Sequence, residues 1–197
     1  MNARTSHIIL IVAAFVAGLA LFAGAFVIAA GNLSTSPGPS AIGGAFTLTD
    51  QDGKPITEAA LKGRPSLVFF GYTHCPDVCP TTLFDISEVL RSLGPDAART
   101  TALFITVDPE RDTPAVMKDY LSSFDPHLKG LTGDSTAVAK VTSEYRVYAK
   151  KVPLKDGDYT MDHTALVYLM DRDGKFVAPF NLKRKPEEAA ADLKHYL

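Results

Sequence analysis

An apolar run near the N-terminus restricts the fold of this chain more than any other feature. Residues Ile8 to Ala30 are only Ile, Leu, Val, Ala, Phe and Gly, without a single charge. As a helix rising about 1.5 Å per residue, the run is long enough to cross a hydrocarbon core of about 30 Å. A helix packed in a soluble core would show a polar stripe, which this run lacks. We therefore predict a transmembrane anchor at residues 8–30.

A cleaved signal peptide is the alternative for this run, because Ala29, Ala30 and Gly31 are small enough for a cleavage site. The apolar region of a signal peptide extends only to about 15 residues, however. Arg4 precedes the run, and the next charge after it is Asp50. The positive-inside rule then places residues 1–7 in the cytoplasm and the rest outside.

The N-terminal flank also bears on the compartment. A mitochondrial presequence would need an Arg-rich amphipathic stretch before the anchor, and only Met1 to His7 are available for it. We predict a single-pass protein of the bacterial cytoplasmic membrane, with its C-terminal domain facing the periplasm.

The remaining chain divides into a linker and one domain. Residues 31–44 are rich in Gly, Ser and Pro and predict a flexible linker. Residues 45–197 have the size of a single domain. The net charge of the whole chain is −2, and no Lys/Arg stripe appears, so nucleic-acid binding has no electrostatic basis. Nothing in the sequence requires more than a monomer.

The order of predicted elements indicates the fold class. Apolar runs predict strands and apolar residues at helical spacing predict helices. We expect a hairpin around 46–54, strands at 66–71 and 101–107, a hairpin at 165–178, and helices at 82–93, 114–124, 135–148 and 186–197. This order predicts an α/β, thioredoxin-like mixed sheet with flanking helices and an extra N-terminal hairpin.

Both cysteines of the chain, Cys75 and Cys79, lie in one short segment, residues 71–80. The segment follows the predicted strand at 66–71, at the strand end where open α/β sheets place their sites. Cysteines at i and i+4 face the same side of a first helical turn, so both sulfurs can meet one ion or each other. A helix N-terminus also favours thiolates, which metal binding and thiol exchange both require.

Several chemistries compete for this pair. A structural disulfide would close a loop of five residues, too short for much entropic gain. Thioredoxin-type reductases place two residues between their cysteines, whereas this chain has three. The peroxiredoxin pattern Pro-x-x-x-Thr-x-x-Cys is absent. Structural zinc takes four protein ligands. Soft thiolates with an imidazole suit copper in either oxidation state.

Three motifs, in order along the chain, resemble the Sco/SenC family. They are Gly71-Tyr-Thr-His-Cys-Pro-Asp-Val-Cys-Pro80, Val107-Asp-Pro-Glu-Arg-Asp-Thr-Pro114, and Asp162-His163 before an apolar strand. The resemblance extends from about Ala45 to the C-terminus, and the predicted anchor matches too. Met161 and Thr164 depart from the Val and Ser that more commonly flank the Asp-His pair.

The resemblance implies a copper chaperone for cytochrome c oxidase assembly, in which Cys75, Cys79 and His163 bind Cu(I) or Cu(II). It implies delivery to the dinuclear copper centre of oxidase subunit II, with other periplasmic copper chaperones as further partners. The alternative is a thiol–disulfide oxidoreductase whose catalytic pair, Cys75 and Cys79, reduces the cysteines of that target. A copper or redox sensor is a third class, which no separate signalling segment supports. Whether the chain is an enzyme stays open.

The other histidines have simpler interpretations. His7 is expected at the membrane edge, His127 in a loop and His195 in the last helix. His74 adjoins Cys75 and could cover the site or assist thiolate formation.

Two further segments lie near the predicted site. Residues 152–162 contain Gly and Asp, and we expect a mobile loop that brings His163 in when metal binds. Within it, Asp162 could orient the imidazole or cap a turn. Met161 could be a spare soft ligand, although packing is the more common role of such a residue. The charged segment Asp108 to Asp112 is explained by a solvated turn before a helix that we expect Thr113 to cap, and no chemistry is assigned to it.

Overall fold

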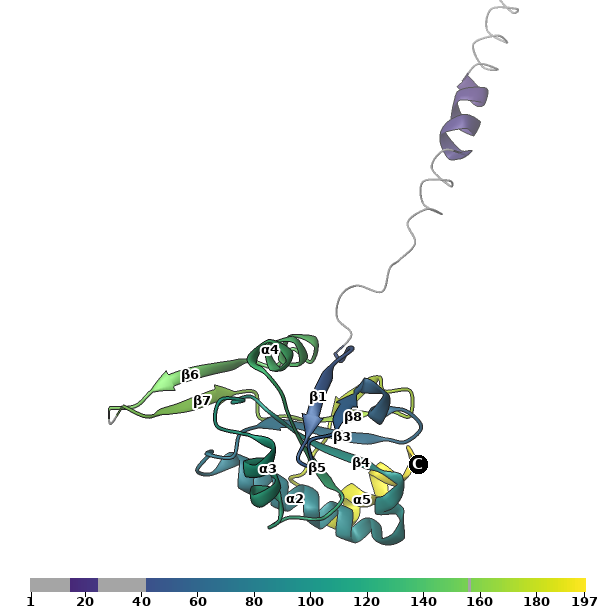
Figure 1. Ribbon diagram of the computed structural model, residues 1–197. Coiled ribbons are helices and arrows are strands. Elements are labelled where there is room, and N and C mark those ends of the chain that lie inside the picture. The colour runs from purple at the N-terminus through teal and green to yellow at the C-terminus, as the bar shows by residue number, and fades with distance from the viewer. Residues whose placement is uncertain (1–14, 25–41, 156) are drawn as a thin grey trace, which may run out of the picture. The chain divides into compact units, whose positions relative to one another are not determined.

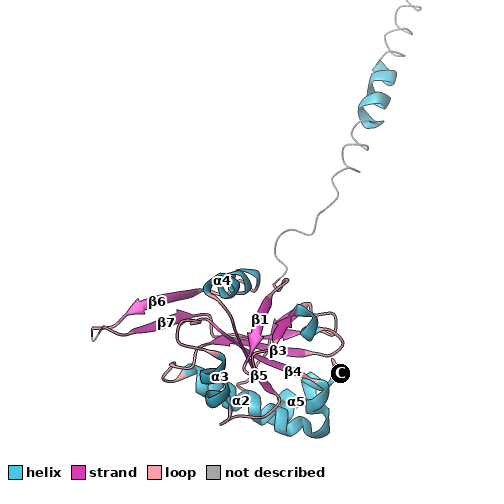
Figure 2. Cartoon of the chain, viewed as in Figure 1, coloured by secondary structure: helices cyan, strands magenta, loops and turns pink. Residues whose placement is uncertain are grey.

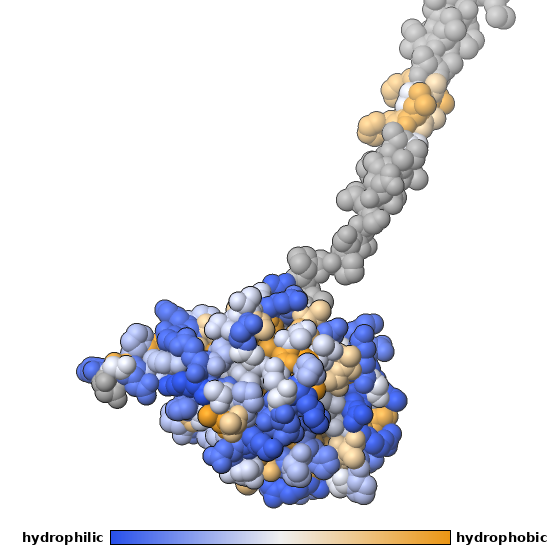
Figure 3. Space-filling model, viewed as in Figure 1, coloured by the Kyte–Doolittle hydropathy of each residue, from blue (hydrophilic) through white to orange (hydrophobic). Residues whose placement is uncertain are grey.

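The computed structural model describes residues 15–24, 42–155 and 157–197, and the chain forms two compact units, Met1–Ser40 and Ala41–Leu197. In the first unit, residues 15–24 are helical, and their exposed apolar side chains are seen in Figure 3. No helix within the described residues is long and apolar enough to cross a membrane. The predicted residues 1–7, both ends of the predicted anchor and most of the predicted linker lie outside the described residues.

A mixed sheet organises the second unit. Within the described residues its seven strands follow the order β2-β1-β5-β4-β3-β8-β9 (Figures 1 and 2). The strands are β1 (Thr47–Asp50), β2 (Pro55–Thr57), β3 (Ser66–Gly71), β4 (Thr101–Thr106), β5 (Leu128–Thr132), β8 (Val167–Met170) and β9 (Phe176–Pro179). β3, β4 and β5 are mutually parallel, whereas β8 pairs antiparallel with β3, and β1 with β5.

Helices cover both faces of this sheet. They are α2 (Val78–Leu93), α3 (Pro114–Leu121), α4 (Ser135–Glu144) and α5 (Pro186–Lys194), with short 3-10 helices at Glu58–Leu61 and Gly94–Arg99. Figure 1 shows α2, α3 and α5 below the sheet and α4 above it. Thr113 caps α3 and Asp134 caps α4, each accepting a backbone N–H of the first turn. The strand order and the two helical layers confirm the predicted mixed α/β class.

The core explains why β3 is an uninterrupted apolar run. Each of its residues is buried, because β4 and β8 flank it and helices cover its faces. Leu83, Ile86 and Leu90 of α2 are at most 1% exposed, as their helical spacing predicts. The predicted N-terminal hairpin is present as β1 and β2.

Several predicted bounds were wrong. α2 begins at Val78 rather than 82, so Cys79 lies in its first turn. α3 ends at Leu121, not 124. α4 ends at Glu144, well short of 148, because Arg146 adopts a left-handed backbone with φ of 55° that a helix cannot continue through. Strand β5 was not predicted, since its five residues include Lys129 and Gly130 and give only a short apolar signal.

The predicted mobile loop at 152–162 was also wrong. These residues belong to a hairpin of β6 (Ala149–Pro153) and β7 (Tyr159–His163), which projects from the main sheet in Figure 1. His163 therefore ends strand β7, and it also precedes the apolar strand β8, as predicted. β-branched and aromatic residues such as Val152, Tyr159 and Thr160 favour strands and outweigh the turn-forming residues, which gather at the tip.

Candidate metal centre

The loop from β3 to α2 places the two cysteines. Cys75 precedes α2 and is half-buried, whereas Cys79, in the first helical turn, is fully buried. The backbone N–H of Cys79 lies 3.3 Å from the sulfur of Cys75 and donates to it. Both cysteines are free thiols. The helical spacing thus turns both sulfurs to one side, as predicted.

Gly71, the last residue of β3, makes room for Cys79. A Cβ atom at position 71 would lie 2.7 Å from the Cys79 sulfur and 2.8 Å from Cε2 of Phe104, closer than real Cβ contacts. A larger residue would displace the sulfur or the ring. This role of Gly71 was not predicted, because only the packing of α2 against β3 reveals it.

His163 meets the cysteines from the far side of the site. Its Nε2 lies 3.5 Å from the Cys79 sulfur, and its Nδ1 lies 3.0 Å from the carbonyl oxygen of Thr164. A carbonyl only accepts hydrogen bonds, so Nδ1 carries the proton and Nε2 presents its lone pair to Cys79. The rings of Tyr72 and Phe69 approach the imidazole edge-on and fix its plane.

The donor atoms of Cys75, Cys79 and His163 all lie within 4.8 Å of one another. The structure thus brings together the three predicted ligands, although Cys75 and His163 are 88 positions apart in the chain (163 − 75 = 88). Two soft sulfurs and one imidazole nitrogen form a donor set that suits copper.

Burial sets the protonation of this site before a metal binds. It raises the pKa of the buried Cys79 thiol above its ordinary value, so this group keeps its proton at neutral pH. Burial also lowers the pKa of His163 below its ordinary value, against smaller opposing effects of the Thr164 carbonyl and Asp162. The thiol of Cys79 therefore donates to a neutral imidazole, and a metal ion would take the place of that proton.

Other predicted candidates lie apart from these donors. His74 is exposed, with its Nδ1 3.0 Å from the Thr73 hydroxyl, and His127 is exposed beside Asp125. His195 caps the C-terminus of α5, and His7 lies outside the described residues.

The two neighbours of His163 in β7 behave as side chains of a strand. Asp162 is exposed, and the imidazole bonds to the Thr164 carbonyl in place of its carboxylate. Met161 packs against the core.

The charged segment after β4 is not the solvated turn that was predicted. Asp108 is 2% exposed and Asp112 is fully buried, whereas the predicted cap of α3, Thr113, is confirmed. The Asp112 carboxylate accepts from the backbone N–H and hydroxyl of Thr73 and from the hydroxyl of Thr106. Asp112 thus ties the cysteine loop to the end of β4. Its burial was not predicted, because a run of charged residues usually indicates an exposed segment.

These features define a class of protein: a thioredoxin-like domain with two thiols and one imidazole at the carboxyl end of a central strand. A family model described as SCO1/SenC matches residues 34–197. The chain therefore belongs to the SCO1/SenC family.

Individual relatives agree. A SCO2-like protein of Rickettsia felis is 41% identical over 155 residues, 78% of this chain and 76% of that protein. The structure of Bradyrhizobium japonicum ScoI with copper bound is 75% identical with a TM-score of 0.78, covering 80% of this chain and all of that one. The crystal structure of Arabidopsis thaliana ScoI with copper bound is 36% identical with a TM-score of 0.71, covering 78% of this chain and 97% of that one.

Proposed function

We propose that this chain is a membrane-anchored copper chaperone. It holds copper through Cys75, Cys79 and His163 and delivers it to the dinuclear copper centre of cytochrome c oxidase subunit II. The convergence of the three donor atoms within 4.8 Å carries the proposal. Membership of the SCO1/SenC family, and the copper in two related structures, support it.

The proposed setting is the bacterial cytoplasmic membrane. Residues 8–30 form the anchor, residues 31–44 the linker, and residues 45–197 the periplasmic domain. The exposed apolar side chains of the helical residues 15–24 support this setting, with Phe15 at 70% and Phe22 at 74% exposure. Such a surface is unfavourable in water and favourable in hydrocarbon.

The unequal burial of the three donors suggests an order of release. Cys75 and His163 are partly exposed, whereas Cys79 is buried. A donor group of the partner protein therefore reaches the ion from the side of Cys75 and His163. Ligand exchange begins at Cys75 and His163, and Cys79 is the last protein ligand to dissociate from the ion.

A thiol–disulfide oxidoreductase is the second candidate, favoured by the two free thiols whose sulfurs lie within the same 4.8 Å. In that reaction Cys75 and Cys79 lose two electrons and two protons and form a disulfide, and the partner's disulfide becomes two thiols. The raised pKa of Cys79 makes it a poor resting nucleophile. Such a reaction needs only the two sulfurs and does not require an imidazole.

A transfer assay tests the proposal. The full-length chain in mild detergent is loaded with Cu(I) and mixed with the copper-free, reduced copper domain of a bacterial oxidase subunit II. Two Cu(I) ions are colourless, so the mixture is then oxidised with ferricyanide, which removes one electron from the dinuclear centre. We expect the absorption of the oxidised dinuclear centre to appear, and to be lost with the Cys75→Ser, Cys79→Ser double variant. If the loaded chain transfers no copper while the copper-free dithiol form reduces an oxidised subunit II, the oxidoreductase is the better assignment.

Copper affinity should rise with pH. Cys79 holds its proton at neutral pH and must release it to bind the ion, so affinity changes by about tenfold per pH unit for each proton released. His163 adds little above about pH 6.5, because its lowered pKa keeps it neutral there. Competition with a chelator between about pH 6.5 and 8.5 measures the slope. A flat profile would contradict the protonated Cys79.

A further inference from the structure

His163 reaches the cysteines only by way of the β6–β7 hairpin. Within the described residues the two strands of this hairpin pair with each other and with no strand of the main sheet. A two-stranded hairpin is marginally stable at best in water. Contacts outside the hairpin must therefore hold it where the imidazole lies 3.5 Å from the Cys79 sulfur.

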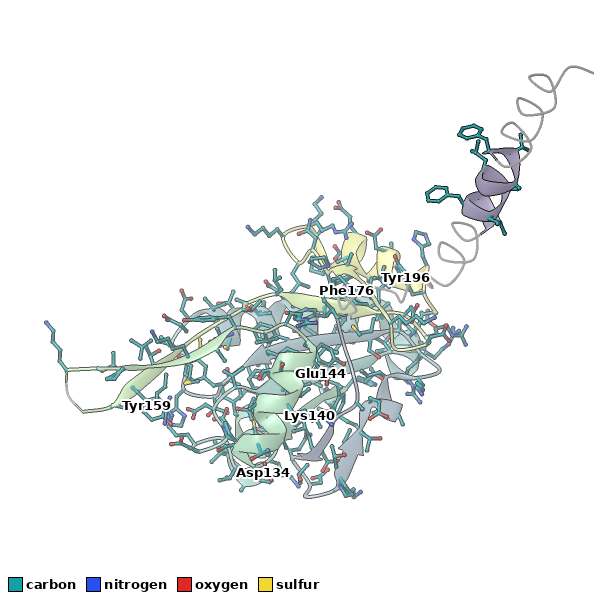
Figure 4. All side chains as sticks on the ribbon, turned by 90° about the horizontal axis from the view of Figure 1, so that it is seen from above. Asp134, Lys140, Glu144, Tyr159, Phe176 and Tyr196 are labelled. Atoms are coloured by element: carbon teal, nitrogen blue, oxygen red, sulfur yellow. The ribbon has the colours of Figure 1, made fainter. Side chains whose placement is uncertain are left out.

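Arg111, in the loop after β4, makes several of these contacts at the start of β7. Its guanidinium carbon lies 3.7 Å from the ring centroid of Tyr159, the first residue of β7, beside the hairpin tip in Figure 4. Its Nη1 donates to the backbone carbonyl of Tyr159 at 3.0 Å and to the Asp158 carboxylate at 3.2 Å. One side chain thus contacts both the ring and the backbone at the start of β7.

The loop that carries Arg111 is fixed by contacts of Asp108 as well. Asp108, 2% exposed, accepts from Nε of Arg111 and, at 2.9 Å, from the Tyr159 hydroxyl. The Arg111 side chain is only 16% exposed, and its Nη2 is buried with no hydrogen-bond partner among the described residues. No hydrogen bond within the described part of the chain compensates for the burial of this nitrogen. The cation–π contact between the guanidinium and the Tyr159 ring supplies an attraction in its place.

The position of Tyr159 couples this contact to the metal site. Side chains at i, i+2 and i+4 of a strand share one face, so Tyr159, Met161 and His163 lie along the same side of β7. Nearer the site, the hydroxyls of Tyr72 and Thr160 lie 2.7 Å apart. Because the loop that carries Arg111 also carries Asp112, the same few residues hold both the cysteine loop and the hairpin.

We propose that Arg111 and Tyr159 are positioning residues for His163: their contact docks the hairpin on the Asp108–Asp112 loop and so presents the imidazole to the two sulfurs. This inference rests on the copper site proposed above. When the hairpin is undocked, His163 is absent from the site and only the thiolates remain. The apparent affinity of an ion that needs the imidazole then falls with the docked fraction, whereas an ion held by two thiolates is little affected.

The test compares Cu(I) and Cu(II) binding in the full-length chain carrying Arg111→Met or Tyr159→Leu. We expect Cu(II) affinity to fall on the order of 10- to 100-fold, the range for groups that orient a metal ligand. Cu(I) affinity should stay within about threefold, because the thiolates suffice for it. The nitrogen coupling in the Cu(II) electron paramagnetic resonance spectrum should weaken. In the metal-free chain, amides of β6 and β7 should exchange hydrogen faster while those of β3 and β4 do not.

Matched controls come from the same hairpin and its base. Lys150→Met and Tyr148→Leu change exposed side chains and should leave both affinities and the hairpin exchange unchanged. Tyr159→Phe keeps the ring but loses the Asp108 bond, so its effect should fall between wild type and Tyr159→Leu.

Three results would overturn the inference: unchanged hairpin exchange, unchanged Cu(II) affinity despite faster exchange, or an equal loss for both ions. If Arg111→Met fails to fold, Tyr159→Leu decides, because this ring packs on the hairpin's outer end, away from the core cluster. If the wild-type chain binds neither ion, the proposed function fails. The exchange of the metal-free chain still decides whether Arg111 and Tyr159 dock the hairpin.

Discussion

Replacing His163 by alanine should lower the Cu(II) affinity of the full-length chain by more than about 100-fold and its Cu(I) affinity by less than about tenfold. Removing a group that merely orients a ligand costs 10- to 100-fold, so losing the ligand itself should cost more. Cu(I) is satisfied by two thiolates, whereas Cu(II) requires the harder imidazole nitrogen. Competition titrations with chelators for each oxidation state measure both affinities.

His74→Ala is the matched control for this prediction, because His74 adjoins Cys75 but is exposed and bonded to Thr73. It should leave both affinities unchanged. An unaltered Cu(II) affinity in His163→Ala would contradict the three-ligand copper site and favour the thiol–disulfide oxidoreductase. A large loss of Cu(II) affinity in His74→Ala would show that His74, and not His163, is the ligand.

Replacing Asp112 by alanine should destabilise the domain by about 3 kcal/mol, because each buried donor left without a partner costs about 1–3 kcal/mol. Thr73 and Thr106 both lose their acceptor. At this chain length the melting temperature should fall by about 6–12 °C. The cysteine loop loosens as well, so both copper ions should bind more weakly, in contrast to His163→Ala. Thermal unfolding and the same titrations measure these effects.

Asp112→Asn separates the charge from the hydrogen bonds. Burial raises the pKa of Asp112, so the folded state favours its protonated form. That contribution to stability is present below the unfolded pKa and is lost as pH rises through the folded one. The cost of Asp112→Asn should therefore be smaller at neutral pH than near pH 4. Asp119→Ala, at an exposed site on α3, should change stability by less than about 0.5 kcal/mol. A similarly small change in Asp112→Ala would contradict the role of Asp112 in holding the cysteine loop to the end of β4.

The elements that were predictable from the sequence are those set by residues close together in the chain. The buried strand β3, the helical spacing of α2 and the caps Thr113 and Asp134 were predictable, because each depends on residues a few positions apart. β5 was missed because its burial comes from β4 and α3, not from its own composition. The hairpin of β6 and β7 was missed because its strands contain no fully buried residue and β6, with Lys150 and Lys151, shows no apolar alternation that would indicate a strand.

The candidate site shows the same division. By itself, the sequence determined that Cys75 and Cys79 share one side of a helical turn, because the helical repeat brings i and i+4 together. It indicated His163 mainly by resemblance to a family. The tertiary structure alone decided that this imidazole lies 3.5 Å from the Cys79 sulfur, that Gly71 leaves room for that sulfur, and that Asp112 is buried. Each of these depends on how β3, β7 and the loop after β4 pack together, and packing between distant segments leaves no local pattern in the chain.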